Sequence, residues 1–151
     1  MNMRQLLSGI LICVSFAAAP LRAADPPAPA QPAEPRMTRI SHAELLERMA
    51  ARDPGLVVLD VRTPAEFAAG HVPGARNVSH DRIDEQLASL EPLRDKLVVL
   101  YCRSGRRSAA AHETLTKAGF SRLRHLEGDF LAWEAEGRPV ERPSEPGQQK
   151  K

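Results

Sequence analysis

The residue best suited to covalent chemistry in this chain is Cys102, and three arginines follow it within five positions. The apolar run of residues 97–101 is typical of a strand buried on both faces. The alanine-rich segment from Ser108 onward favours a helix. Cys102 is therefore predicted to lie at the carboxyl end of a parallel strand and just before a helix N-terminus. Ligands of open α/β sheets bind at this place.

The predicted surroundings of Cys102 favour a thiolate. Unpaired backbone N–H groups of a tight loop can point at an anion, and the helix dipole adds partial positive charge. Arg103, Arg106 and Arg107 add full charges. Because the thiolate is the nucleophilic form of cysteine, these residues predict a nucleophile in a site for an anionic substrate. The alternative is a cysteine that only packs against its strand, which would leave the three arginines without a use.

The spacing of the loop separates two classes of cysteine chemistry. Phosphatases of the tyrosine-phosphatase type wrap a phosphate with a Cys-x5-Arg loop. In this chain the sixth residue after Cys102 is Ser108, and the last arginine, Arg107, comes one position too early. The shorter loop suits a smaller reaction centre, namely a sulfur atom carried on the cysteine. A phosphatase or an arsenate reductase remains a weaker alternative.

The loop sequence Tyr-Cys-Arg-Ser-Gly-Arg-Arg-Ser, residues 101–108, resembles the active-site loop of single-domain rhodaneses, the thiosulfate sulfurtransferases, here of an exported or periplasmic type. The resemblance covers about residues 37–140. Further motifs follow the family's order at residues 59–67, 70–75, 118–120 and 126–128 and at Trp133. One departure is Gly128-Asp129, where the family usually has Gly-Gly, and it affects the expected local turn.

The resemblance implies a two-step sulfur transfer that needs no metal and no organic cofactor. Cys102 attacks the outer sulfur of thiosulfate or a similar small donor, becomes a persulfide, and passes that sulfur to a thiophilic acceptor such as cyanide or a thiol. The loop amides would hold the persulfide anion. Arg103 and Arg107 are the best candidates for the sulfonate end, because guanidinium donors match oxyanions well. The predicted substrate-binding residues are Arg103, Ser104, Gly105, Arg106, Arg107 and Ser108.

Two other functions stay open. A sulfur-carrier or persulfide-binding module would load Cys102 but pass its sulfur to the thiol of a protein partner and turn over small donors poorly. A non-catalytic interaction domain usually lacks the cysteine or has an eroded loop, whereas both are intact here. Metal binding is not expected, because the five histidines show no ligand spacing.

Four residues outside the loop are expected to support the site structurally. Asp60, Arg62 and Glu66 lie at or after the end of a predicted strand, on the same sheet edge as the cysteine loop. Ion pairs among them would hold that loop in place. His71 is a residue type that could act as a general base. A thiolate that the loop dipoles already activate needs no general base, so a structural role is predicted for His71.

Strands alternate with helices along the chain, which predicts an α/β fold with a doubly wound, mostly parallel five-stranded sheet flanked by helices, as in rhodaneses. The predicted strands are residues 38–40, 56–60, 76–78, 97–101 and 122–126. Ser41 with Glu44, and Thr63 with Glu66, have the spacing of capping boxes at helix starts. His42 is expected to be a solvated residue of the first of these helices.

Residues 1–24 are predicted to be a signal peptide with cleavage near Ala23 or Ala24, which makes the protein exported or periplasmic. An uncleaved anchor is the alternative, although the apolar core is shorter than the about 20 residues of a membrane span. No stable membrane span is expected after cleavage. Cys13 would leave with the signal, so the mature chain could form no internal disulfide with Cys102.

Residues 25–36 contain five prolines and are predicted to be a linker, residues 37–141 a single rhodanese-like domain, and residues 142–151 a disordered tail. The chain has 21 Lys and Arg against 19 Asp and Glu, and two of the basic residues belong to the signal segment. The remaining charges balance, so no nucleic-acid partner is expected. The small core, without a large exposed apolar stripe, predicts a monomer.

Overall fold

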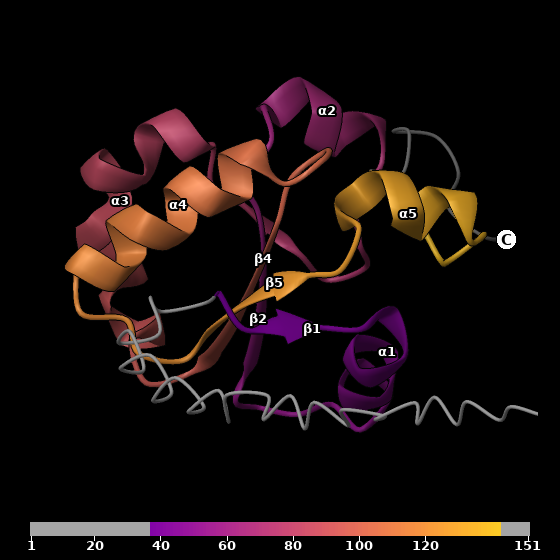
Figure 1. Ribbon diagram of the computed structural model, residues 1–151, viewed down its shortest axis with the longest axis horizontal. Helices are drawn as coiled ribbons and strands as arrows, with labels where there is room; N and C mark the ends of the chain where they lie inside the picture. Colours follow the sequence, from indigo (N-terminus) through magenta and orange to yellow (C-terminus); the bar gives the residue numbers. More distant parts are fainter. Residues whose placement is uncertain (1–36, 143–151) are drawn as a thin grey trace, which may run out of the picture. The chain divides into compact units, whose positions relative to one another are not determined.

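The computed structural model describes residues 37–142, which form a sheet covered by helices on both faces (Figure 1). The sheet has the strand order β1-β5-β4-β2-β3, and every strand pairing is parallel. Its strands are β1 (Arg39–Ile40), β2 (Leu56–Asp60), β3 (Arg76–Asn77), β4 (Leu97–Tyr101) and β5 (Leu123–Leu126). The predicted five-stranded α/β sheet is confirmed, and it is parallel throughout.

The helices are divided between the two faces of the sheet (Figure 1). Residues of α3 and α4 pack against one face, and residues of α1 and α5 pack against the other. The helices are α1 (His42–Ala50), α2 (Pro64–Ala69), α3 (Ile83–Leu90), α4 (Arg106–Lys117) and α5 (Asp129–Ala135), with short 3-10 turns η1 (His80–Arg82) and η2 (Glu91–Leu93) beside α3. This arrangement is the doubly wound fold expected from the alternation of strands and helices.

The central strand β4 determines on which face the cysteine lies. All five of its residues are buried, and successive side chains enter opposite cores. Leu100 belongs to the core on the α4 face and Tyr101 to the core on the α5 face. The same alternation places Cys102, the next residue, on the α4 face. The sulfur therefore lies on the side of the sheet where α4 begins.

Helix α4 begins at Arg106, two residues before the predicted start at Ser108. Gly105 occupies the N-cap position with φ of 102°, a left-handed conformation that glycine adopts without strain. The chain therefore turns from the loop straight into the helix, and both Arg106 and Arg107 lie in the first helical turn. The alanine run indicated the helix but not this glycine turn.

The two predicted capping boxes differ in the structure. At α2 both reciprocal bonds of the Thr63–Glu66 box are present. At α1 only half of the box forms: Glu44 N–H donates to Ser41 Oγ at 3.1 Å. The Glu44 carboxylate accepts from Arg48 and Arg124 instead of turning back to Ser41. A guanidinium competes well for a carboxylate, because the hydrogen bond it donates is charge-assisted.

No helix within residues 37–142 is long and apolar enough to cross a membrane. The predicted signal peptide, the linker and residues 143–151 of the predicted tail lie outside the described residues.

Candidate active site

Cys102 follows β4 directly, and its sulfur faces the start of α4. The residue is only 1% exposed. The Gly105 N–H donates to Cys102 Sγ at 3.1 Å, and Ser108 Oγ, a second possible donor, lies 3.6 Å from the same sulfur. A Cβ at position 105 would come within 3.3 Å of Asp129 Oδ2. Glycine at this position thus permits both the turn and the close packing of the loop on Asp129.

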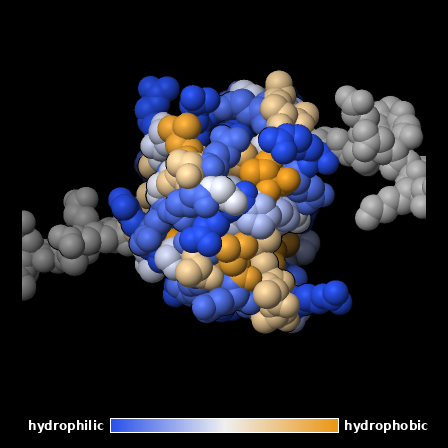
Figure 2. Space-filling model, turned by 90° about the vertical axis from the view of Figure 1, so that its right-hand side faces the viewer, coloured by the Kyte–Doolittle hydropathy of each residue, from blue (hydrophilic) through white to orange (hydrophobic). Residues whose placement is uncertain are grey.

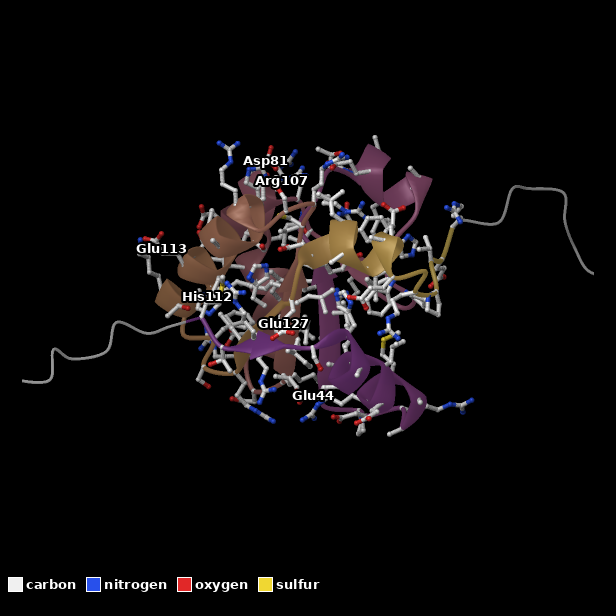
Figure 3. The ribbon with its side chains drawn as sticks, turned by 45° about the vertical axis from the view of Figure 1, so that its right-hand side comes forward. Glu44, Asp81, Arg107, His112, Glu113 and Glu127 are labelled. Carbon is white, nitrogen blue, oxygen red and sulfur yellow. The ribbon has the colours of Figure 1, made fainter. Side chains whose placement is uncertain are left out.

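The three loop arginines have different environments. Arg103 and Arg106 are exposed, as is Ser104, and neither arginine forms an ion pair within residues 37–142. Arg107, at the start of α4 (Figure 3), is partly buried and donates two hydrogen bonds to Glu66, at 2.7 and 2.8 Å. The role of Arg107 in sulfonate binding stays a prediction, and Glu66 already binds both terminal nitrogens of its guanidinium.

The Glu66 carboxylate joins α2 to the cysteine loop. Its Oε2 accepts from the Thr63 N–H at 3.1 Å, which closes the predicted cap, and it also binds Arg107. The hydrogen bond from Arg107 lowers the pKa of Glu66 to about 2, against the opposing effect of burial and with help from Thr63. The same bridge raises the pKa of Arg107, to which Cys102 adds a smaller contribution. One carboxylate therefore stabilises a helix start and orients a cation beside the cysteine.

A second network lies beneath the loop at the end of β2. The predicted ion pair between Asp60 and Arg62 is present and buried, whereas Glu66 pairs with Arg107. The Tyr101 O–H donates to Asp60 Oδ2 at 2.8 Å. Burial, and then the charge of Asp60, raise the pKa of Tyr101. The Arg62 guanidinium also lies 3.9 Å from the centroid of the Phe130 ring, so the network connects β2, β4 and α5.

His71 lies after α2 and contacts its last turn. Its Nδ1 is 2.9 Å from the Phe67 carbonyl oxygen, and the two rings stack with centroids 3.6 Å apart. The backbone of His71 also exchanges two hydrogen bonds with Glu141, at 2.9 and 2.8 Å. These contacts hold the chain after α2 against the segment at residue 141. The predicted supporting role of His71 in the site stays a prediction.

The structure adds to the site two buried residues that the sequence analysis did not assign to it, His125 and Asp129. Asp129 Oδ1 accepts the backbone N–H of Cys102 at 2.7 Å, and Asp129 Oδ2 lies 2.8 Å from His125 Nε2. Ser108 Oγ lies 2.9 Å from the same nitrogen and 3.2 Å from Asp129 Oδ1. Burial would raise the pKa of Asp129, but hydrogen bonds from His125, Cys102 and Ser108 outweigh it and lower that pKa.

Asp129 occupies the position at which the sequence departs from Gly-Gly. Its φ is 55° and that of Gly128 is 66°, so both residues are left-handed. A left-handed turn therefore forms here without a second glycine, because aspartate tolerates this conformation better than most residues. The sequence signalled an unusual residue here, but not its contact with Cys102, which lies 27 positions away along the chain.

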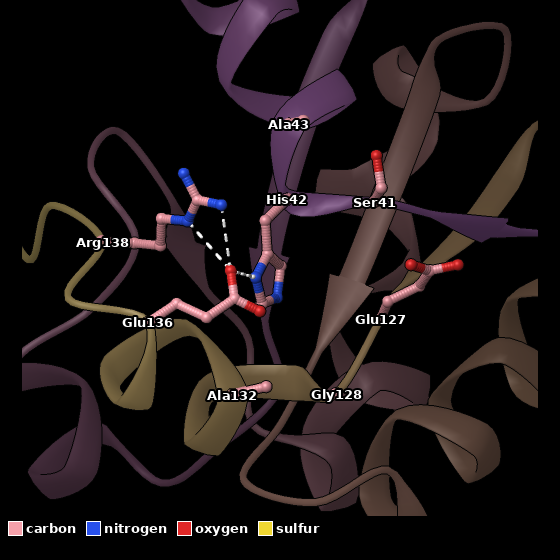
Figure 4. Close-up of a pocket in the computed structure, with 8 residues that line it drawn as sticks. All are labelled: Ser41, His42, Ala43, Glu127, Gly128, Ala132, Glu136 and Arg138. Atoms are coloured by element: carbon pink, nitrogen blue, oxygen red, sulfur yellow. Dashed lines mark hydrogen bonds and ion pairs between the residues drawn. The ribbon is translucent and has the colours of Figure 1, made fainter.

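A separate pocket of ≈ 380 Å³ lies between the start of α1 and α5 (Figure 4). It is lined by Ser41, His42, Ala43, Glu127, Gly128, Ala132, Glu136 and Arg138. His42, expected to be solvated, is buried: its Nδ1 lies 2.9 Å from Glu136 Oε2, and its ring centroid 5.2 Å from that of Trp133, edge to face. Both partners come from the α5 end of the chain, which the local pattern around His42 could not indicate.

A smaller groove of ≈ 190 Å³ lies beside the cysteine loop. It is lined by Arg62, Glu66, Ala69, Gly70, Arg103, Phe130, Leu131 and Glu134. Leu131, on α5, is 44% exposed and is the one large apolar side chain exposed within residues 37–142. On the side of the molecule that carries α5, hydrophobic surface forms small patches among hydrophilic ones (Figure 2). No group of three or more His, Cys, Asp or Glu among the described residues is arranged to hold a metal.

Comparison with known proteins places this chain in a family. Residues 41–136 match the family model of the rhodanese-like domain. A sulfurtransferase of Allochromatium vinosum is 36% identical over 107 residues, which cover 71% of this chain and 97% of that protein. A thiosulfate sulfurtransferase, GlpE, of Pseudoalteromonas translucida is 33% identical over 96 residues, 64% of this chain and 88% of the relative. Other curated relatives are longer proteins, of which the chain covers as little as 21%.

Solved structures give the same result for the fold. The crystal structure of a rhodanese-related protein from Thermoplasma volcanium matches with a TM-score of 0.60 and 35% identity, covering 69% of this chain and 97% of that one.

Proposed function

The chain belongs to the rhodanese-like domain family, and on that premise we propose that it transfers a sulfane sulfur atom from thiosulfate, or a similar small donor, through a persulfide on Cys102. The observation that carries the proposal is the environment of the sulfur. Cys102 Sγ accepts a backbone N–H at 3.1 Å, faces the start of a helix, and has three arginines in its loop. Such an environment stabilises an anionic sulfur.

The proposed reaction has two displacement steps. In the first, the Cys102 thiolate attacks the outer sulfur of thiosulfate; a Cys–S–S⁻ persulfide forms, and the sulfur–sulfur bond of the donor breaks to release sulfite. In the second, cyanide or a thiolate attacks the outer sulfur of the persulfide, and the Cys102 thiolate leaves, with thiocyanate or a new persulfide as product. No proton transfer by a side chain is needed when the attacking and leaving sulfurs are anions.

Support for thiosulfate as donor comes from the charge of the loop and from the name of the Pseudoalteromonas relative. The exposed Arg103 lines the groove beside the cysteine loop, and Arg107, held by Glu66, lies near enough to Cys102 for Cys102 to raise its pKa. Both guanidinium groups are charge-assisted donors for a sulfonate. An uncharged donor would make no use of either arginine.

The donor is tested with Arg107→Ala. We expect kcat/KM for thiosulfate to fall about ten- to a hundredfold, since charge-assisted hydrogen bonds of about 1.5–3 kcal/mol are lost. A donor without a charged leaving group should lose much less. Steady-state assays of thiocyanate formation with both donors decide the matter. Equal losses with the two donors would count against sulfonate recognition by Arg107.

A persulfide carrier that serves a protein thiol is the second candidate. The groove beside Arg103, with the exposed Leu131 at its edge, favours an acceptor larger than cyanide. In this case Cys102 would load with sulfur as before, but cyanide would discharge it slowly. A protein or peptide thiol would discharge it faster, and Leu131→Ser would slow that acceptor while leaving the cyanide reaction unchanged.

A further inference from the structure

The two displacement steps, as written above, do not use a buried polar cluster that lies against Cys102. It consists of Ser108, His125 and Asp129, which are 0%, 7% and 3% exposed. Buried polar side chains cost free energy unless their hydrogen bonds are satisfied. The three residues come from α4, β5 and the start of α5, and converge on one point below the sulfur. A cluster placed at that point calls for an explanation.

The hydrogen-bond pattern assigns the ring proton of His125. Its Nδ1 has no hydrogen-bond partner within residues 37–142, whereas its Nε2 lies 2.8 Å from Asp129 Oδ2 and 2.9 Å from Ser108 Oγ. A neutral imidazole carries one N–H, and a carboxylate can only accept. The Nε2–H therefore donates toward Asp129 and Ser108, and Asp129 fixes the ring in that orientation.

This assignment determines what the Ser108 hydroxyl can do. Its oxygen faces the Nε2–H of His125, so its own single proton points elsewhere. Three acceptors are within reach: the Gly105 carbonyl oxygen at 2.9 Å, Asp129 Oδ1 at 3.2 Å and Cys102 Sγ at 3.6 Å. Asp129 Oδ1 already accepts the Cys102 N–H at 2.7 Å, so Ser108 would be its second donor. A negative charge on the sulfur makes it a charged acceptor, which forms a stronger hydrogen bond than the neutral Gly105 carbonyl, and Asp129 already has two other donors.

We propose that Asp129 and His125 are positioning residues that hold the Ser108 hydroxyl as a hydrogen-bond donor to Cys102 Sγ whenever that sulfur is a thiolate. This role rests on the proposed function. It gives the cluster a part in both displacement steps, since the Cys102 thiolate is the attacking group in the first and the leaving group in the second. The hydroxyl is a second donor beside the Gly105 N–H. Asp129 contributes twice, because it also holds the Cys102 backbone.

Other charged and titratable groups around the cluster must be kept constant in any test. The groups on α4 are Arg107, His112 and the exposed Arg106. Glu66 of α2 pairs with Arg107. Burial and then His125 lower the pKa of His112. On β1, Arg39 is the register partner of His125. Variants that change only the hydrogen bonding of Ser108 and His125 leave all these groups in place.

The experiment follows thiolate formation at Cys102 by its ultraviolet absorbance as the pH is raised. Each full-length variant is measured against the same variant carrying Cys102→Ser, which cancels absorbance from other groups. The informative pair is His125→Asn and His125→Gln, because only the glutamine amide nitrogen extends to the position of Nε2. Ser108→Ala removes the donor itself, and circular dichroism checks each fold. If His125→Asn does not fold, His125→Ser replaces it.

We expect Ser108→Ala and His125→Asn each to raise the midpoint of thiolate formation by about one pH unit. His125→Gln should stay near the wild-type midpoint. The double variant Ser108→Ala/His125→Asn should match Ser108→Ala alone, since His125 acts through Ser108. An unmoved midpoint in Ser108→Ala, or additive shifts in the double variant, overturns the proposal. The readout needs no sulfur transfer, so a wild-type protein that fails to accept sulfur from thiosulfate refutes the proposed function and leaves this test valid.

Discussion

The bridge between Glu66 and Arg107 predicts a stability change with a defined pH dependence. Glu66→Gln keeps the shape of the side chain and an oxygen for the Thr63 cap, but removes the charge that binds Arg107. The bridge has two hydrogen bonds, at 2.7 and 2.8 Å, between side chains that are 20% and 31% exposed. A variant without it should be less stable at neutral pH, because the paired charges are partly shielded from water.

The size of this loss of unfolding free energy follows from the pKa of Glu66. A decrease from the ordinary value of 4.5 to about 2 would correspond to about 3 kcal/mol of unfolding free energy if the group were fully shielded. Solvent screening of the partly exposed pair reduces this to about 1–2 kcal/mol. Because the folded pKa is the lower one, the stabilisation is complete above about pH 5 and is lost as the pH falls toward 2. It should drop to less than half of its neutral value by about pH 3.

Urea unfolding of both proteins between pH 7 and pH 3, followed by the fluorescence of the single tryptophan, Trp133, measures this difference. Glu113→Gln is the matched control, since Glu113 forms a 2.7 Å pair with Lys117 on the exposed face of α4. We expect the control to change stability little at any pH. A Glu66→Gln difference that is absent at pH 7, or that stays constant down to pH 3, would refute the assignment of this bridge.

Two further substitutions test the packing around the site. Tyr101→Phe removes the buried O–H that donates to Asp60, and should lower the unfolding free energy by about 1–3 kcal/mol in urea titrations; an unchanged midpoint would show that the network adds no stability. Gly128→Ala places a Cβ 2.3 Å from that of Ala132, whereas Gly137→Ala, with the same φ of 66°, meets open space. The first should therefore cost about 1–3 kcal/mol more than the second, and equal losses would contradict the contact.

The order of the elements and the place of the cysteine could be predicted because they depend on local patterns. The apolar run before Cys102 indicated a strand buried on both faces, and β4 is fully buried. Thr63 and Glu66 have a spacing that acts within one helical turn, and their reciprocal cap is present. Such features need only the neighbouring residues to form, so the sequence carries their whole signal.

Contacts between distant segments could not be predicted in the same way. Glu66 was expected to pair near β2, but it binds Arg107, which lies 41 positions away. His42 was placed in solvent, because the partners that bury it come from α5. Asp129 appeared only as a departure from Gly-Gly. Its carboxylate reaches Cys102 because parallel strands bring their carboxyl ends to the same edge of the sheet.

Sulfur transfer through Cys102 can be tested by the intact mass of the protein before and after thiosulfate, and again after cyanide. We expect thiosulfate to add one sulfur atom, about 32 Da, and cyanide to remove it as thiocyanate. Cys102→Ser should keep the fold and gain nothing. The starting mass also locates any cleavage near Ala23 or Ala24. A wild-type protein that gains no sulfur, or a Cys102→Ser variant that does, would contradict sulfur transfer through Cys102.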